Sequence, residues 1–123
     1  MTRTTVRVAR IYEPANVTDG VRVLVDRLWP RGMTRAKAAL NEWCKQVAPS
    51  TELRRWYGHE PARFTEFRRR YRRELDGPEQ AAALAHLKEL ANGNTLTLLT
   101  GSKDVAISEA TVLAELIDEN AHR

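Results

Sequence analysis

The chain has 123 residues, of which 42% are hydrophobic and 29% charged, and its formal net charge is +4. This balance is typical of an ordinary folded domain and excludes a disordered tail. Cys44 is the only cysteine, which excludes a disulfide within the chain, and the longest aliphatic run, residues 23–25, is too short to span a membrane. Since no signal-peptide pattern precedes the first strand-like segment, we predict one cytoplasmic domain over residues 1–123 that does not enter a membrane.

The charges are unevenly distributed along the chain. Eight arginines lie between Arg54 and Arg73, whereas residues 104–120 contain five acidic residues and no basic one. Such a distribution favours a phosphate-bearing or polyanionic partner at one face of the molecule. The alternative is an arginine-rich helix whose side chains are simply solvated.

Two strands are predicted in the first third of the chain. Residues 5–12 alternate loosely, and residues 21–28 have the β-branched centre typical of a strand buried on both faces. Pro30 and Gly32 stop this second strand, because proline donates no ladder hydrogen bond and glycine permits the turn. Residues 36–47 are ambiguous, since their first part favours a helix and residues 43–47 fit a strand.

The middle of the chain is predicted to be helical. Ser50 and Gly58 are suitable caps for a helix over residues 51–57, and Pro61 suits the first turn of the next helix. One face of that next helix carries large apolar side chains at helical spacing: Phe64, Phe67, Tyr71 and Leu75. Residues 76–78 separate it from a third helix, which ends at residues 92–93.

A strand over residues 95–100 and a last helix complete the predicted elements. The last helix follows the turn at residues 101–104 and presents four apolar residues to the core: Ala106, Ala110, Leu113 and Ile117. Early strands, central helices and a final strand–helix pair predict an α/β fold with a small, mostly parallel sheet covered by helices.

Charged residues follow two of the predicted strands. Asp26, Arg27 and Arg31 come after the second strand, and Ser102 and Lys103 lie in the turn after the last strand. Ligands of open α/β sheets bind beyond the carboxyl ends of the strands, and a small-residue loop before a helix favours an anion. We therefore predict that Arg27, Arg31, Ser102 and Lys103 bind a phosphate- or carboxylate-bearing ligand.

Two residues are candidates for acid–base chemistry at this site. Asp26 is suited to act as a general base or to orient an arginine, and His59 is a peripheral acid–base candidate. The structural alternatives are an Asp26–Arg27 ion pair, a packing role for His59 and a helix-capping role for Asp104. The sequence leaves open whether the domain catalyses a reaction on the anionic ligand or only binds it.

No metal or cofactor is predicted. Cysteines and histidines do not occur at metal-ligand spacing, and the turn at residues 100–104 lacks the full phosphate-loop pattern. Cys44 has no histidine nearby in the sequence, so we interpret it as a buried, unreactive thiol.

The alternative function is nucleic-acid binding by the arginine-rich helix around residues 61–75. Its candidate contacts are arginines on and before that helix: Arg54, Arg55, Arg69, Arg72 and Arg73. Glu66 and Glu74 are each four residues from Arg70, so ion pairs would partly neutralise the helix. No helix-turn-helix, zinc-finger or aromatic RNA-binding signature accompanies the basic residues.

The run at residues 22–32, RVLVDRLWPRG, resembles the signature of the YeaO-like proteins, a bacterial family of uncharacterised proteins (domain of unknown function 488). Further similar segments extend over nearly the whole chain: Glu42-Trp43, Lys45, Ala48-Pro49-Ser50, Leu53-Arg54, Trp56-Tyr57-Gly58-His59, Pro61, Phe67, Tyr71, Glu74-Leu75, Leu96-Thr97-Leu98-Leu99 and Val112-Leu113. The resemblance implies a compact α/β domain and no established activity. The chain departs from the family pattern at Arg35, Glu60, Thr100-Gly101-Ser102 and Ser108, and the last two departures lie at or near the predicted anion site.

Overall fold

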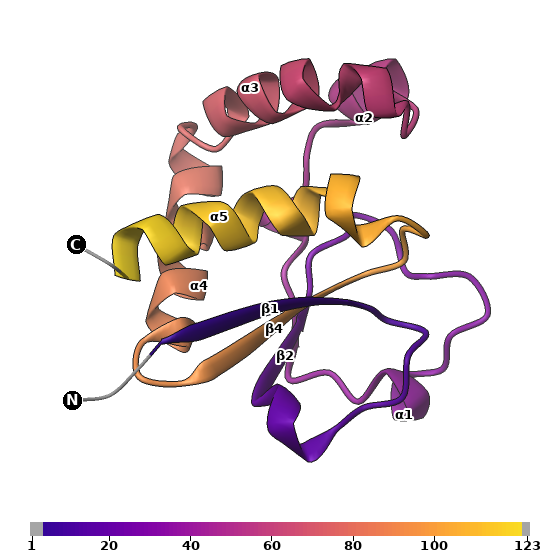
Figure 1. Ribbon diagram of the computed structural model, residues 1–123, viewed down its shortest axis with the longest axis vertical. Helices are drawn as coiled ribbons and strands as arrows, with labels where there is room; N and C mark the ends of the chain where they lie inside the picture. The colour runs from indigo at the N-terminus through magenta and orange to yellow at the C-terminus, as the bar shows by residue number, and fades with distance from the viewer. Residues whose placement is uncertain (1–3, 122–123) are drawn as a thin grey trace.

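The computed structural model describes residues 4–121, which fold into a small sheet with helices against it (Figure 1). Four parallel strands lie in the order β1-β4-β2-β3. Their bounds are β1 Thr5–Arg10, β2 Val21–Leu24, β3 Glu42–Trp43 and β4 Thr95–Thr100. The predicted small parallel sheet is confirmed, and β4 has the predicted bounds.

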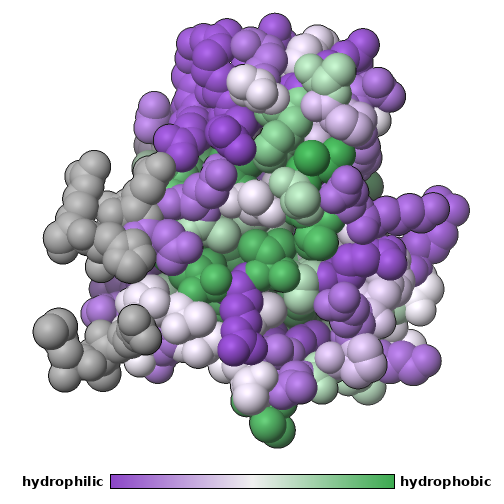
Figure 2. All heavy atoms as spheres, viewed as in Figure 1, coloured by the Kyte–Doolittle hydropathy of each residue, from purple (hydrophilic) through white to green (hydrophobic). Residues whose placement is uncertain are grey.

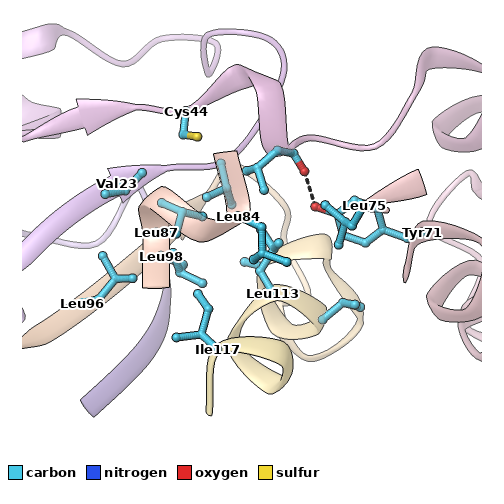
Figure 3. Packing of buried hydrophobic residues seen from close by; sticks show 14 of the residues in the cluster. Val23, Cys44, Tyr71, Leu75, Leu84, Leu87, Leu96, Leu98, Leu113 and Ile117 are labelled. Carbon is cyan, nitrogen blue, oxygen red and sulfur yellow. Dashed lines mark hydrogen bonds between the residues drawn. The ribbon is translucent and has the colours of Figure 1, made fainter. Parts of the chain in front are cut away.

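Five α-helices accompany the sheet. They are α1 (Arg35–Ala38), α2 (Thr51–Tyr57), α3 (Phe64–Glu74), α4 (Pro78–Ala91) and α5 (Glu109–Ala121). The helices α2 to α5 pack on one face of the sheet, where the large core lies; Figure 3 shows Leu96 and Leu98 of β4 beside Leu87, Leu113 and Ile117. The other face is covered by a smaller apolar cluster that includes Ala38 of α1.

Two predicted strands are longer than the observed ones. The strand expected over residues 5–12 ends at Arg10, where the Glu13 N–H donates to the Arg10 carbonyl and the chain turns. The strand expected over residues 21–28 ends at Leu24, although the Val25 N–H still donates to the Leu99 carbonyl. The turn that carries the predicted site therefore begins earlier than the apolar pattern indicated.

Residues 36–47 contain both a helix and a strand, each very short. The helix α1 ends with Ala39 in the left-handed region, and the two-residue β3 then pairs with β2. A strand over residues 43–47 was wrong beyond Trp43, because Lys45–Val47 forms a 3-10 turn. The short strand β3 therefore forms this edge of the sheet.

The predicted apolar face of the helix around residues 61–75 is confirmed. Phe67, Tyr71 and Leu75 are buried in the main core, and Phe64 packs against it. The Tyr71 hydroxyl donates to the Val47 carbonyl, as drawn in Figure 3. This bond ties α3 to the segment that follows β3.

The last helix begins later than predicted. Residues Val105–Ile107 form a 3-10 turn capped by the Asp104 side chain, which accepts from the Ala106 N–H, and α5 starts only at Glu109. Ala106 is exposed in this turn, so its predicted core position is wrong, whereas Ala110, Leu113 and Ile117 are buried as expected. The capping alternative for Asp104 is confirmed.

Candidate anion-binding pocket

The two predicted turns meet at the carboxyl ends of the central strands. Because β2 and β4 are neighbours and parallel, Asp26 lies against the residues that end β4. Its Oδ1 atom accepts from the Thr100 hydroxyl at 2.8 Å, and its Oδ2 atom accepts from the Gly101 N–H at 2.7 Å. Two hydrogen bonds at the predicted site thus join residues that lie some 75 positions apart in the sequence.

The loop after β4 is already engaged within the protein. The Gly101 N–H donates to the Asp26 carboxylate, and the Ser102 N–H lies 3.2 Å from the Thr100 hydroxyl oxygen. The Ser102 carbonyl accepts from Arg10 Nε at 3.0 Å. In addition, a 3-10 turn separates this loop from the N-terminus of α5. We expected this loop and the start of the next helix to bind an anion. That expectation is corrected, because the loop's Gly101 N–H already donates to the protein's own Asp26 carboxylate.

A cavity of about 630 Å³ lies beside this junction, between the strand ends and α2. Its charged and hydroxyl-bearing lining residues are Asp26, Arg27, Thr51, Arg54, Arg55, Tyr57, His59, Ser102 and Glu109. Its other lining residues are Leu28, Pro49, Phe67 and Gly101. This volume falls within the usual range for small-molecule sites.

The cavity brings together four of the six residues predicted for the anion site. Asp26, Arg27, Ser102 and His59 line it, whereas Arg31 and Lys103 are exposed and lie outside its lining. The Arg31 carbonyl accepts from the Tyr12 hydroxyl at 2.7 Å. The grouping of the first four follows from the adjacency of β2 and β4 and from the position of α2.

Arg27 is held by backbone carbonyls rather than by Asp26. Its Nε and Nη2 atoms donate to the Pro49 carbonyl at 3.3 and 3.2 Å. Among the described residues it forms no ion pair with Asp26, so the predicted Asp26–Arg27 pair is wrong. The guanidinium keeps its charge at the cavity wall.

Helix α2 supplies to the cavity two arginines that the sequence had indicated as contacts to a nucleic acid. Arg54 and Arg55 are exposed and line the cavity, and their side chains form no ion pair with any described residue. The Ser50 hydroxyl caps this helix by accepting from the Leu53 N–H, while the Ser50 N–H and hydroxyl donate to the Glu74 carboxylate at 2.8 and 2.5 Å. The clamp ties the N-terminus of α2 to the C-terminal end of α3, and it corrects the predicted Glu74–Arg70 pair.

His59 follows the left-handed Gly58 at the end of α2 and is itself left-handed, with φ 57°. Its exposed ring lies 5.7 Å from the ring of Tyr57. Burial raises the pKa of Tyr57 to about 12, so its hydroxyl stays protonated and donates to the Ile107 carbonyl at 2.6 Å. The histidine is the more accessible titratable group at this side of the cavity.

Glu109 is the site residue that the sequence did not indicate. It is 9% exposed, lines the cavity, and its Oε1 atom lies 3.5 Å from the Thr100 hydroxyl oxygen. Burial, together with hydrogen bonding and charge repulsion from Asp26, raises the pKa of Glu109 well above its usual value. Glu109 therefore holds its proton more tightly than an exposed glutamate does.

The basic helix α3 is largely compensated by its own neighbours. Glu66 accepts from Arg69 Nη2 at 2.6 Å and from Arg70 Nε at 2.7 Å, which confirms the predicted Glu66–Arg70 pair. Arg68 pairs with Glu115 of α5 at 3.3 Å. Figure 2 shows a mostly hydrophilic surface where α3 lies and apolar residues gathered lower, over α5. These pairs reduce the charge that α3 offers to a nucleic acid.

Cys44 is buried in the main core, and burial raises the pKa of its thiol. Because the thiolate is the reactive form, we expect thiol reagents to modify the native protein very slowly. In denaturant the reaction should run at the rate of a free cysteine, at least about tenfold faster. A colorimetric thiol assay with and without urea measures both rates, and rapid labelling of the native protein would contradict the burial.

Metal-ligand clusters and membrane-spanning helices can be sought in residues 4–121, the part of the chain that the structure describes. No group of three or more histidine, cysteine or acidic side chains gathers there as a metal site would require. No helix in that part of the chain is both long and apolar enough to cross a membrane.

The fold and the cavity define a small parallel α/β domain with a mixed-charge pocket beyond the carboxyl ends of its two central strands. A family model described as "Inactive DUF488-N3 subclade" matches residues 5–123, and the chain belongs to this family. It is 50% identical over 115 residues to an "Uncharacterized protein" of Mycobacterium tuberculosis, covering 94% of this chain and 95% of the relative. It is 43% identical over 106 residues to "Uncharacterized protein YeaO" of Escherichia coli, covering 86% of this chain and 90% of that protein.

The YeaO-like resemblance is thereby confirmed. An uncharacterized protein of Mycobacterium bovis is also 50% identical over 115 residues. No solved structure gives a significant match to the chain.

Proposed function

We propose that the pocket binds a small ligand carrying a phosphate or carboxylate group, and that Arg54, Arg55 and Arg27 hold this anion. The observation that carries the proposal is that Arg54 and Arg55 face a cavity at the strand ends with no carboxylate partner among the described residues. A guanidinium offers planar, bidentate hydrogen bonding that suits both phosphate and carboxylate. His59 lines the same cavity.

We propose binding rather than catalysis as the role of the pocket. The description of the matching family as an inactive subclade supports this choice. So does the position of Asp26, whose two oxygens already accept hydrogen bonds from Thr100 and Gly101 and thereby organise the strand ends. We also propose that the protein acts in the cytoplasm, which the single unpaired thiol supports.

The test is a comparison of two arginine variants in binding to phosphorylated and carboxylated metabolites, measured by calorimetry. Replacing both Arg54 and Arg55 by alanine should weaken binding by about tenfold or more, since a hydrogen bond to a charged group contributes about 1.5 to 3 kcal/mol. The matched control is Arg31→Ala, because Arg31 is an exposed arginine outside the cavity. No binding to the wild type, or equal loss in both variants, would refute the anion site.

The nucleic-acid alternative makes a different prediction for the same arginines. Arg54, Arg55, Arg69, Arg72 and Arg73 would bind DNA or RNA with an affinity that falls steeply as salt rises. It has less support, because Arg69 is already paired with Glu66. A steep salt dependence with oligonucleotides that Arg73→Ala reduces would favour it over the pocket.

A further inference from the structure

The cavity has a chemical asymmetry that bears on the rest of the ligand. Arg54 and Arg55 are exposed, so their guanidinium groups lie at its open side, whereas Arg27 is half-buried. Glu109 is 9% exposed and Asp26 is half-buried, so the carboxyl groups lie further in. A ligand whose anion meets the arginines would therefore extend its body towards the carboxyl pair.

The volume of the cavity exceeds what an anion alone requires. About 630 Å³ is the size of a site for an organic molecule of some ten to thirty atoms, whereas a bare phosphate would leave most of this space to water. Pro49 and Phe67 are buried and contribute apolar wall, and Leu28, 63% exposed, lies at the rim. The ligand thus has room for a compact carbon skeleton beyond its charged group.

The inner wall presents hydrogen-bond acceptors that an apolar skeleton would leave unsatisfied. Asp26 receives one bond at each oxygen, from Thr100 and from Gly101, although each carboxylate oxygen can accept two. Covering this carboxylate with an apolar group would remove it from water without replacing the lost hydrogen bonds, which is unfavourable. A ligand group that donates to Asp26 avoids that cost.

Hydroxyl groups suit this wall better than other donors do. The half-buried Ser102 hydroxyl also lines the cavity, the exposed Thr51 adds a second hydroxyl nearer the open side, and a hydroxyl both donates and accepts. A ligand hydroxyl can therefore donate to Asp26 while it accepts from Ser102, whereas an ammonium group can only donate. The mixed set of one carboxylate and two side-chain hydroxyls matches a row of hydroxyls on a small skeleton.

We infer that the ligand is a hydroxylated organic phosphate or carboxylate of about the size of a sugar phosphate, with its anion at Arg54 and Arg55 and its hydroxyls at Asp26 and Ser102. The inference rests on the proposed anion site and adds the class of molecule that the site selects. Asp26 and Ser102 would select ligands that carry hydroxyl groups, and the arginines would provide affinity for the charged group.

The experiment compares two phosphates of similar shape, glucose 6-phosphate and cyclohexylmethyl phosphate, which has the ring but no hydroxyls. The wild-type protein should bind the sugar phosphate about tenfold more tightly, as one satisfied buried carboxylate implies. In Ser102→Ala and Asp26→Asn this ratio should fall towards one. Thermal unfolding checks each variant, and if Asp26→Asn does not fold, the wild-type ratio and Ser102→Ala decide.

The outcomes separate this inference from the proposed function. If neither phosphate binds, the anion site itself fails. If both bind equally, the anion site stands and the selectivity for hydroxyls is refuted. A preference for the sugar phosphate that persists unchanged in the folded variants also overturns the inference, because the hydroxyls would then contact other residues.

Discussion

Replacing Glu109 by glutamine should make the stability of the protein much less dependent on pH above about pH 4.5. The pKa of Glu109 is raised well above its usual value in the folded protein, by burial and by Asp26. Below the unfolded pKa the carboxyl is protonated in both states. As the pH rises past that value, the unfolded chain releases the proton while the folded chain retains it, so the free energy of unfolding falls.

The size of this loss follows from proton linkage. Each pH unit between the unfolded and folded pKa values lowers the free energy of unfolding by about 1.4 kcal/mol for one retained proton. Glutamine has a similar shape and does not titrate, so its variant should lose this slope. Urea titrations at a series of pH values from 4.5 upward measure it, and parallel curves for both proteins would contradict the raised pKa of Glu109.

Glu66→Gln is the control of opposite sign. Hydrogen bonds from Arg69 and Arg70 lower the pKa of Glu66 to about 2. Its contribution to stability is therefore present above the ordinary carboxyl pKa of 4.5 and is lost as the pH falls towards 2. The two variants should thus differ from the wild type in opposite directions. The basic residues that line the cavity beside Glu109, namely Arg27, Arg54, Arg55 and His59, are common to both variants.

Gly20→Ala should be among the most destabilising single substitutions in the chain, at about 3 kcal/mol or more. Gly20 precedes β2 with φ 66° and ψ −130°, a conformation that is essentially restricted to glycine. A Cβ atom there would lie 2.2 Å from the Thr95 carbonyl oxygen, at the start of β4. Since that oxygen belongs to the backbone of a central strand, relief would require the sheet to shift.

Gly32→Ala separates backbone strain from this collision. Gly32 also has a positive φ, 76°, but nothing lies within 4 Å of its added Cβ. Its replacement should therefore cost only the strain, about 1 kcal/mol. Denaturant titrations of both variants measure the difference, and equal losses would show that the contact with Thr95 contributes nothing.

Local patterns predicted those parts of the fold that depend on neighbours in the sequence. The alternation and β-branching of residues 95–100 define β4, and the spacing of Phe67, Tyr71 and Leu75 defines the buried face of α3. Ser50 and Gly58 cap α2 as their side-chain chemistry and backbone freedom require. Where the segments were short, at residues 36–47 and 105–108, the local signals overlapped and the bounds were wrong.

The candidate site was predicted only in part, because much of it depends on contacts across the sheet. The convergence of Asp26 with the loop after β4 followed from two apolar strands ending in polar turns. Glu109 gave no such signal, since an acidic residue in an expected helix is usually exposed. Arg54 and Arg55 appeared to extend a basic helix, and the local sequence does not show that α2, tied to α3 by the Glu74–Ser50 clamp across 24 residues, brings them to the cavity.

The position of β4 within the sheet has a consequence for how the chain folds during synthesis. Both β1 and β2 pair with β4, and β1 has no other partner among the described strands. Residues 95–100 therefore leave the ribosome long after the two strands that need them, and the sheet cannot assemble before most of the chain has been made. Until then the apolar residues of β1 and β2 lack their final neighbours, which makes folding slow and chaperone contact useful.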